Sequence, residues 1–152
     1  MVIGVPKEIK EAENRVAVIP AGVKALRAHG HRVLVQRGAG VGSGLPDESY
    51  ARAGAELVDD PRAVYGEADL IYKVKEPLPA ECEMLREGQV LFTYLHLAPT
   101  PELTKRLLAR RVVAVAYETV ETPSGRKPLL EPMSEIAGRM AVHVGAHYLA
   151  TP

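Results

Sequence analysis

A lysine and a histidine each follow an apolar segment that has the composition of a buried strand. Lys75 comes shortly after residues 68–72, and His96 comes shortly after residues 90–94. Both segments are short and combine branched aliphatic with aromatic side chains, as buried parallel strands do. Ligands of open α/β sheets bind just beyond the carboxyl ends of the strands. We therefore expect Lys75 and His96 to lie where small-molecule chemistry takes place.

His96 is the candidate general acid and base, because an imidazole exchanges protons near neutral pH. A positioned proton donor or acceptor typically accelerates a reaction by about 10² to 10⁴. The alternative is a histidine that is satisfied by a backbone carbonyl in the turn before Pro99, and the residues alone favour neither. Tyr94 and Glu118 follow strands that we expect to end at the same edge, so they are candidates for supporting the site from behind.

Lys75 and Arg15 are the candidate anion-binding residues. Arg15 closes a strongly charged segment, residues 7–14, immediately before the apolar residues 15–19, so it is well placed to point inward at a strand edge. An ammonium and a planar guanidinium together can hold a carboxylate and polarise a neighbouring carbonyl. The alternative for each is an ordinary surface charge. Lys73 should face the other side of the extended chain, so only one of the two lysines is expected to reach the site.

Segments typical of strands and helices alternate along the chain. The sequence predicts strands at residues 2–5, 32–36, 55–58, 70–73, 90–94 and 111–117, and helices at residues 20–29, 47–53, 60–65, 80–85, 100–110 and from 132 to about 149. This alternation predicts an α/β fold with a mostly parallel sheet and helices on both faces. The last strand, at residues 111–117, is expected to lie in the core.

Two domain segments are expected. Residues 1–132 should form the domain that carries the site, and turn-forming residues at 121–128 precede a long helix within residues 133–152. Because no strand follows this helix in the sequence, we interpret it as a connector to a further part of a larger protein.

The glycine-rich segment at residues 38–44 resembles a dinucleotide-binding loop only superficially. Neither Gly38 nor Gly40 starts a complete G-x-G-x-x-G pattern, and Pro46 interrupts the chain before a helix can begin. We therefore expect a structural loop rather than a phosphate cradle, in which glycines supply positive φ angles and close backbone approach.

Composition excludes several classes of function. The chain has 152 residues, 47% of them hydrophobic and 25% charged, with a formal net charge of zero. This length gives about one domain with a sizeable core, and the balanced charge does not indicate a nucleic acid or an anionic membrane as partner. No apolar run approaches the roughly 20 residues of a membrane-spanning helix. A cytoplasmic protein is expected.

Neither the cysteine nor the paired histidines indicate a metal site. Cys82 is the single cysteine, so it can form no internal disulfide and is expected to be inert. His143 and His147 stand one helical turn apart, but the glutamate of the H-E-x-x-H zinc motif is missing. No metal is expected.

Five blocks in the same order resemble the amino-terminal domain of the family that contains alanine dehydrogenase and nicotinamide nucleotide transhydrogenase. The blocks lie within residues 4–20, 38–55, 73–77, 94–98 and 133–138, so that the resemblance covers essentially the whole chain. It implies a Rossmann-like or flavodoxin-like sheet and the NAD-dependent oxidative deamination of L-alanine to pyruvate and ammonia. It also implies a homo-oligomer, often a hexamer.

The same resemblance implies roles for individual residues. Arg15 and Lys75 match residues that hold the carboxylate and carbonyl of the substrate, and His96 matches the residue that exchanges protons. Ser134 matches a serine on the cofactor side of the domain junction, with Met133 beside it. Asn14, Ile19 and Leu45 depart from the family pattern, but none of these departures removes a functional group.

Two alternatives remain at this point. Transhydrogenase domains share the fold and the early motifs but lack the lysine and histidine that match Lys75 and His96. A non-catalytic domain that keeps only the fold is the second alternative. In the family the NAD-binding domain follows the connector helix, so these residues are expected to be incomplete for catalysis on their own.

Overall fold

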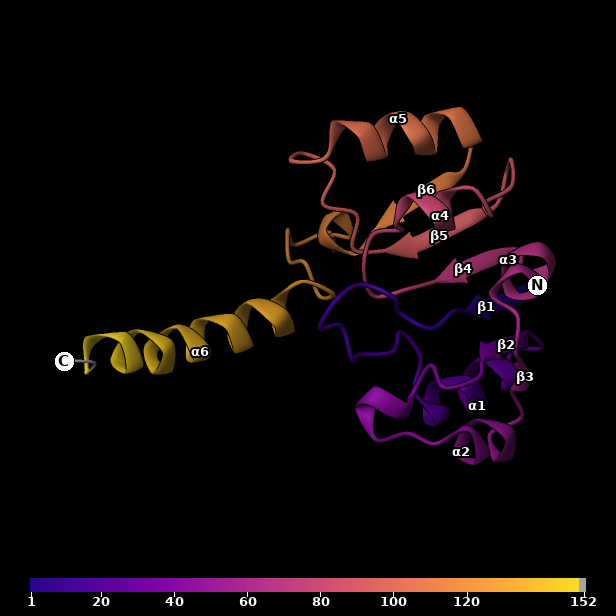
Figure 1. Cartoon of the computed structure of the whole chain (residues 1–152), viewed down its shortest axis with the longest axis horizontal. Helices are drawn as coiled ribbons and strands as arrows, with labels where there is room; N and C mark the ends of the chain where they lie inside the picture. The colour runs from indigo at the N-terminus through magenta and orange to yellow at the C-terminus, as the bar shows by residue number, and fades with distance from the viewer. Residues whose placement is uncertain (151–152) are drawn as a thin grey trace. The chain divides into compact units, whose positions relative to one another are not determined.

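One six-stranded sheet organises the molecule, for which a computed structural model describes residues 1–150 (Figure 1). The strand order is β3-β2-β1-β4-β5-β6, and the pairs β1–β2, β1–β4, β2–β3 and β4–β5 are parallel. The strands are β1 (Val2–Val5), β2 (Arg32–Gln36), β3 (Glu56–Val58), β4 (Leu70–Tyr72), β5 (Val90–Thr93) and β6 (Val113–Ala116). The predicted α/β fold with a parallel sheet is confirmed.

Helices connect the strands at the predicted places, with ends that shift by a few residues. They are α1 (Pro20–Ala28), α2 (Asp47–Arg52), α3 (Pro61–Glu67), α4 (Pro79–Cys82), α5 (Pro101–Arg110) and α6 (Glu131–Leu149). Four of them, α1, α3, α4 and α5, begin with a proline, whose fixed φ suits the first helical turn. Asp60 caps α3 by accepting a hydrogen bond of 2.8 Å from the amide of Arg62.

Helices cover both faces of the sheet, as predicted. Val5 of β1 packs in one cluster with Val23 of α1 and Tyr50 of α2. Its neighbour Gly4 faces the other side, where a Cβ atom would lie only 2.9 Å from the Val64 side chain of α3. Because side chains alternate along a strand, α1 and α2 lie on one face and α3 lies on the opposite face.

One detail of the prediction, the burial of the last strand, is wrong. The apolar residues 15–19 belong to no strand, and the Tyr50 hydroxyl holds this segment by donating a hydrogen bond of 2.9 Å to the carbonyl of Val18. β6 is a strand but not a core strand, since Val113 and Val115 are 52% and 38% exposed. An apolar sequence predicts extended backbone, but it does not tell whether other elements cover an edge strand.

The chain forms two units, Met1–Val115 and a second one from Ala116 onward, which are described separately. The second unit contains a short 3₁₀ helix (Tyr117–Thr119) and α6. None of the residues of α6 is buried. Residues 151 and 152, the end of the segment interpreted as a connector, lie outside the described residues.

A buried ion cluster ties the segments that leave β1 and β4. Lys73 directly follows β4, and its fully buried ammonium lies 3.1 Å from a carboxylate oxygen of Glu8 and 2.6 Å from one of Glu81. The Tyr65 hydroxyl donates to the same Glu81 oxygen at 3.0 Å, and burial, followed by the charge of Glu81, raises the pKa of Tyr65 so that it stays a donor. The second Glu8 oxygen accepts a hydrogen bond of 2.7 Å from the amide of Val74. The cluster therefore fixes where the segment after β1 meets the segment after β4.

Replacing Lys73 by methionine should destabilise the fold strongly. Lys73→Met keeps most of the buried volume but leaves the carboxylates of Glu8 and Glu81 buried without their ammonium, so we expect the free energy of unfolding to fall by about 3–5 kcal/mol. Urea unfolding followed by circular dichroism measures this change. Lys105→Met, which breaks an exposed pair with Glu102, is the control and should have little effect. Equal stability of the two variants would contradict a structural role of the cluster.

Candidate active site

The candidate site lies at the carboxyl ends of β1, β4 and β5, in the unit formed by residues 1–115 (Figure 1). β1 and β4 are neighbours although β2 and β3 follow β1 in the sequence, so the strand order changes direction between them. Ligands of open α/β sheets bind at such a switch point. We use the term rim for the residues that follow these strands and take part in the contacts below: Lys10, Glu13, Arg15, Lys75, Glu76, Tyr94 and His96.

Contacts from two neighbouring segments fix the backbone at Lys75. The hydroxyl of Thr93, a fully buried residue at the end of β5, donates a hydrogen bond of 2.9 Å to the Lys75 carbonyl. Glu8 accepts from the Val74 amide at 2.7 Å and lies 3.5 Å from the Lys75 amide. Lys73 is buried whereas Lys75 is partly exposed, so only Lys75 of the two lysines is available at the rim, as predicted.

Arg15 binds a carboxylate in the structure. Its Nε and Nη2 atoms donate to the two oxygens of Glu13 at 2.8 Å and 2.6 Å, which is the bidentate geometry that guanidinium groups offer to carboxylates. The hydrogen bonds from Arg15 lower the pKa of Glu13 against the effect of burial, and the charge of Lys75 lowers it further. The same hydrogen bonds raise the pKa of Arg15. Arg15 and Lys75 therefore both act on one carboxylate.

His96 stands in an unusual backbone conformation directly after β5. Its φ angle is 47°, in the left-handed region that non-glycine residues rarely adopt and that is frequent at functional sites. The Thr100 hydroxyl donates a hydrogen bond of 2.7 Å to the His96 carbonyl. The imidazole is about half exposed, its Nδ1 lies 3.4 Å from a carboxylate oxygen of Glu76, and its ring centre lies 5.9 Å from that of Tyr94.

Glu76 connects His96 to a second cation. The Lys10 ammonium donates to one oxygen of Glu76, and the other oxygen faces His96. Burial acts to raise the pKa of Glu76, but the hydrogen bond from Lys10, one from the backbone, and the charges of Lys10 and His96 together lower it below its ordinary value. Glu76 is therefore a carboxylate at neutral pH.

Shared neighbours bring the three predicted residues together. Arg15 and Lys75 both lower the pKa of Glu13, Tyr94 lies near enough to Arg15 to contribute to its raised pKa, and the Tyr94 ring lies beside His96. His96 in turn faces Glu76, the residue next to Lys75. The guanidinium, the ammonium and the imidazole thus lie along one edge of the sheet rather than on different sides of the molecule.

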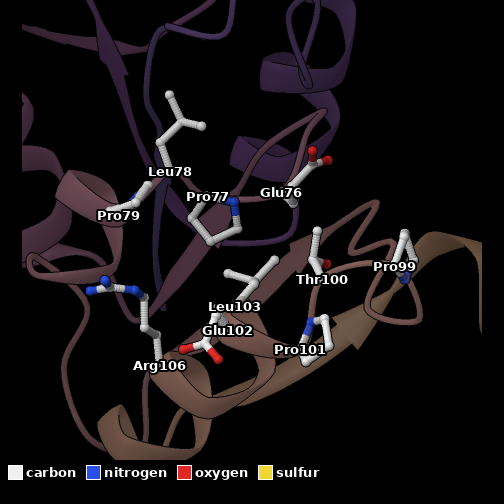
Figure 2. A pocket seen from close by; sticks show the side chains of 10 residues that line it. All are labelled: Glu76, Pro77, Leu78, Pro79, Pro99, Thr100, Pro101, Glu102, Leu103 and Arg106. Atoms are coloured by element: carbon white, nitrogen blue, oxygen red, sulfur yellow. The ribbon is translucent and has the colours of Figure 1, made fainter.

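Two hollows adjoin this edge. A small cavity of about 140 Å³ lies at Arg15, Glu13 and the glycine-rich loop, and can accommodate only a small molecule. A larger groove of about 450 Å³ lies between the segment after β4 and the start of α5. Pro77, Leu103 and Arg106 are among the groove residues, and Figure 2 shows that the carboxylate of Glu76 points away from Leu103 and Arg106.

The glycine-rich loop is structural, as predicted. The amide of Gly38 donates to the Asp47 carboxylate at 2.9 Å, and Gly38 and Gly44 have φ angles of 73° and 72°. A Cβ atom on Gly40 would lie 2.6 Å from the Leu45 carbonyl, so this position requires glycine. The Asp47 carboxylate and the positive φ angles thus give the loop a structural role, and its having no phosphate-binding role stays a prediction.

The remaining candidates are Cys82 and two residues of the second unit. The Cys82 thiol is buried, and burial, followed by the charge of Glu81, raises its pKa, which disfavours the reactive thiolate. Ser134 is exposed in the first turn of α6, in the second unit, and its cofactor role stays a prediction. Glu118 lies in the 3₁₀ helix of the same unit.

Residues 1–150 contain neither a metal-binding cluster nor a membrane-spanning helix. These residues contain no cluster of three or more histidine, cysteine, aspartate or glutamate side chains that could hold a metal. Within the same range, no helix has the length and apolar character needed to cross a membrane.

The sequence did not identify the carboxylates near the candidate cations as part of the site. Glu13 and Glu76 stand within two residues of Arg15 and Lys75, and Glu8 lies in the same charged loop. Acidic residues beside basic ones are typical of solvated surfaces, so their types did not single them out. Their adjacency to the two candidate cations was the only available signal.

Comparisons with known proteins agree with the fold and the motifs. The family model described as "Alanine dehydrogenase/PNT, N-terminal domain" matches residues 4–137. Proteins named alanine dehydrogenase from Methanococcus maripaludis and Bacillus subtilis are 56% and 58% identical over 98% and 100% of this chain, which spans 40% of each of them.

Solved structures of the same two kinds of protein also match this chain. A structure named L-alanine dehydrogenase matches 98% of this chain with a TM-score of 0.92 and 48% identity, and 41% of that protein is covered. A transhydrogenase from Sinorhizobium meliloti matches 78% of this chain with a TM-score of 0.73 and 31% identity, and 34% of that protein is covered. The chain therefore belongs to the family of alanine dehydrogenase/PNT N-terminal domains, and it spans about two fifths of the length of its dehydrogenase relatives.

Proposed function

We propose that this chain is the substrate-binding part of an NAD-dependent alanine dehydrogenase. The reaction converts L-alanine, NAD⁺ and water into pyruvate, ammonium, NADH and a proton. The observation that carries the proposal is the placement of Arg15, Lys75 and His96 along one edge of the sheet, where Arg15 lines a cavity of small-molecule size. Relatives named alanine dehydrogenase, at 56% and 58% identity, support it as well.

Arg15 is the proposed partner of the substrate carboxylate. Its guanidinium already binds the Glu13 carboxylate in two-point geometry, so the same atoms can bind the carboxylate of alanine or pyruvate. The substrate is expected to take the place of Glu13. Lys75, which lowers the pKa of the same carboxylate, is proposed to donate a hydrogen bond to the keto oxygen of pyruvate.

His96 is the proposed proton carrier. After hydride leaves the Cα atom of alanine, water attacks the resulting imine and the carbinolamine loses ammonia. Each of these steps moves a proton at the substrate, and an imidazole beside a fixed carboxylate and carbonyl can accept and return it. The half-exposed side chain of His96 is accessible for this exchange.

NAD supplies the hydride acceptor in the proposed reaction. Ser134, exposed in the first turn of α6, is the residue of this chain proposed to contact it. The glycine-rich loop lacks the complete G-x-G-x-x-G pattern, so we expect the main NAD-binding residues in the part of the relatives that this chain does not span.

The family resemblance also supports further proposals about organisation. Residues 1–132 form the proposed substrate domain, and residues 133–152 form a connector toward the NAD-binding domain. By the same resemblance we expect a homo-oligomer, a hexamer in many relatives, located in the cytoplasm.

Pyruvate should bind to this chain through Arg15 and Lys75. Isothermal titration calorimetry measures the affinity, and because hydrogen bonds between charged groups contribute about 1.5–3 kcal/mol, Arg15→Ala and Lys75→Ala should each weaken binding at least about tenfold. Lys105→Ala, which changes an exposed lysine on α5, is the matched control. A chain that is indifferent to pyruvate would favour the transhydrogenase alternative or a non-catalytic domain.

Turnover requires the full length of the relatives, which a chimera provides. In a Bacillus subtilis alanine dehydrogenase whose first domain is replaced by this chain, Lys75→Ala should abolish deamination of alanine and His96→Ala should lower it at least about a hundredfold. NADH absorbance measures the rate. His29→Ala is the control, since its exposed imidazole contacts the Ala25 carbonyl on α1. Near-normal turnover in His96→Ala would remove the histidine from the mechanism.

A further inference from the structure

Glu76 has one carboxylate oxygen that is buried and unsatisfied. Its Oε1 atom accepts the ammonium of Lys10, but Oε2 has no hydrogen-bond partner among the described residues 1–150. The Nδ1 atom of His96 lies 3.4 Å from this Oε2, longer than an ordinary hydrogen bond, and the two groups are not aligned as a hydrogen bond requires. A small rotation and shift of the imidazole would form the contact, and hydrogen bonds of catalytic groups are often long or poorly aligned before a substrate binds.

This arrangement determines which imidazole nitrogen can carry the proton. A neutral imidazole has one nitrogen that donates and one that accepts, and an ionised carboxylate only accepts. A carboxylate that faces Nδ1 therefore favours the tautomer with the hydrogen on Nδ1 and the lone pair on Nε2. In a histidine without such a partner, the tautomer with hydrogen on Nε2 is the more populated one.

We propose that Glu76 is a positioning residue for His96, which keeps the imidazole hydrogen on Nδ1 and presents Nε2 as the proton-accepting atom. The inference rests on the proposed function for its catalytic meaning, because the substrate that Nε2 would meet is part of that function. The tautomer itself is a property of the chain alone.

Several contacts keep Glu76 in place for this role. The Glu76 side chain is 14% exposed, the neighbouring Lys75 backbone is fixed by Thr93 and Glu8, and Lys10 holds the second oxygen. The pKa of Glu76 is lowered, since the groups that favour the charged form outweigh burial, so this side chain is a carboxylate at neutral pH. If Glu76 only formed a surface ion pair with Lys10, both of its oxygens would be exposed to solvent. Instead, Oε2 is buried and faces His96.

Nitrogen NMR of the imidazole tests the inference directly. In the chain labelled with ¹⁵N-histidine, long-range ¹H–¹⁵N spectra above the titration range of the imidazoles distinguish the two tautomers. The signals of His96 are assigned by their loss in His96→Gln. We expect the Nδ1–H tautomer to predominate in the unmodified chain and the Nε2–H tautomer to become the major one in Glu76→Ala.

A control variant distinguishes the contact between Glu76 and His96 from the general effect of removing a negative charge. Glu102→Ala removes a carboxylate that lines the same groove but is paired with Lys105, and it should leave the His96 tautomer unchanged. A predominant Nε2–H tautomer in the unmodified chain would overturn the inference, even if Glu76→Ala did not fold. An unchanged tautomer in folded Glu76→Ala would overturn it too. Absence of pyruvate binding would affect only the proposed function, because the tautomer is measured without substrate.

Discussion

The buried ammonium of Lys73 is the constraint on which the site depends. It lies between the carboxylates of Glu8, in the segment after β1, and Glu81, in α4. Lys73 itself directly follows β4. A buried charge is tolerated only when its partners are in place, so these segments have one favourable arrangement. Glu8 also holds the amide of Val74. The position of Lys75 at the rim is therefore a consequence of the cluster beneath it.

Burial decides which cations are structural and which are available for a ligand. Lys73 and Lys75 are two residues apart, yet the first is fully buried in a closed cluster and the second reaches the partly exposed rim. Arg15 is also partly exposed, and its carboxylate partner Glu13 stands two residues before it in the sequence. An ion pair that remains accessible to water is weaker than a buried one and can be exchanged. Exchange of Glu13 for a substrate carboxylate is consistent with the proposed function, whereas exchange at Lys73 would break the fold.

The fold was largely predictable because its signals are local. Prolines at helix starts and short apolar segments predicted most elements to within a few residues. The pairing of charges was not predictable, since Glu8 and Lys73 are 65 residues apart and Lys10 and Glu76 are 66 residues apart. These pairs exist because β1 lies beside β4, and the sequence alone did not reveal the strand order. For the same reason the exposure of β6 was missed, because burial depends on neighbours and not on the strand itself.

Placement along the sheet explains why the cations were predicted and their partners were not. A residue that follows a buried strand must lie at the carboxyl edge, whatever the strand order, so Lys75 and His96 could be assigned to one edge from local patterns. The role of each carboxylate depends on which side chains the fold places opposite it. Glu76 is a surface-type residue by sequence, but in the structure it is a carboxylate held by Lys10 and directed at His96. The rim therefore combines strand ends that local sequence specifies with partners that only the long-range pairing of strands brings into contact.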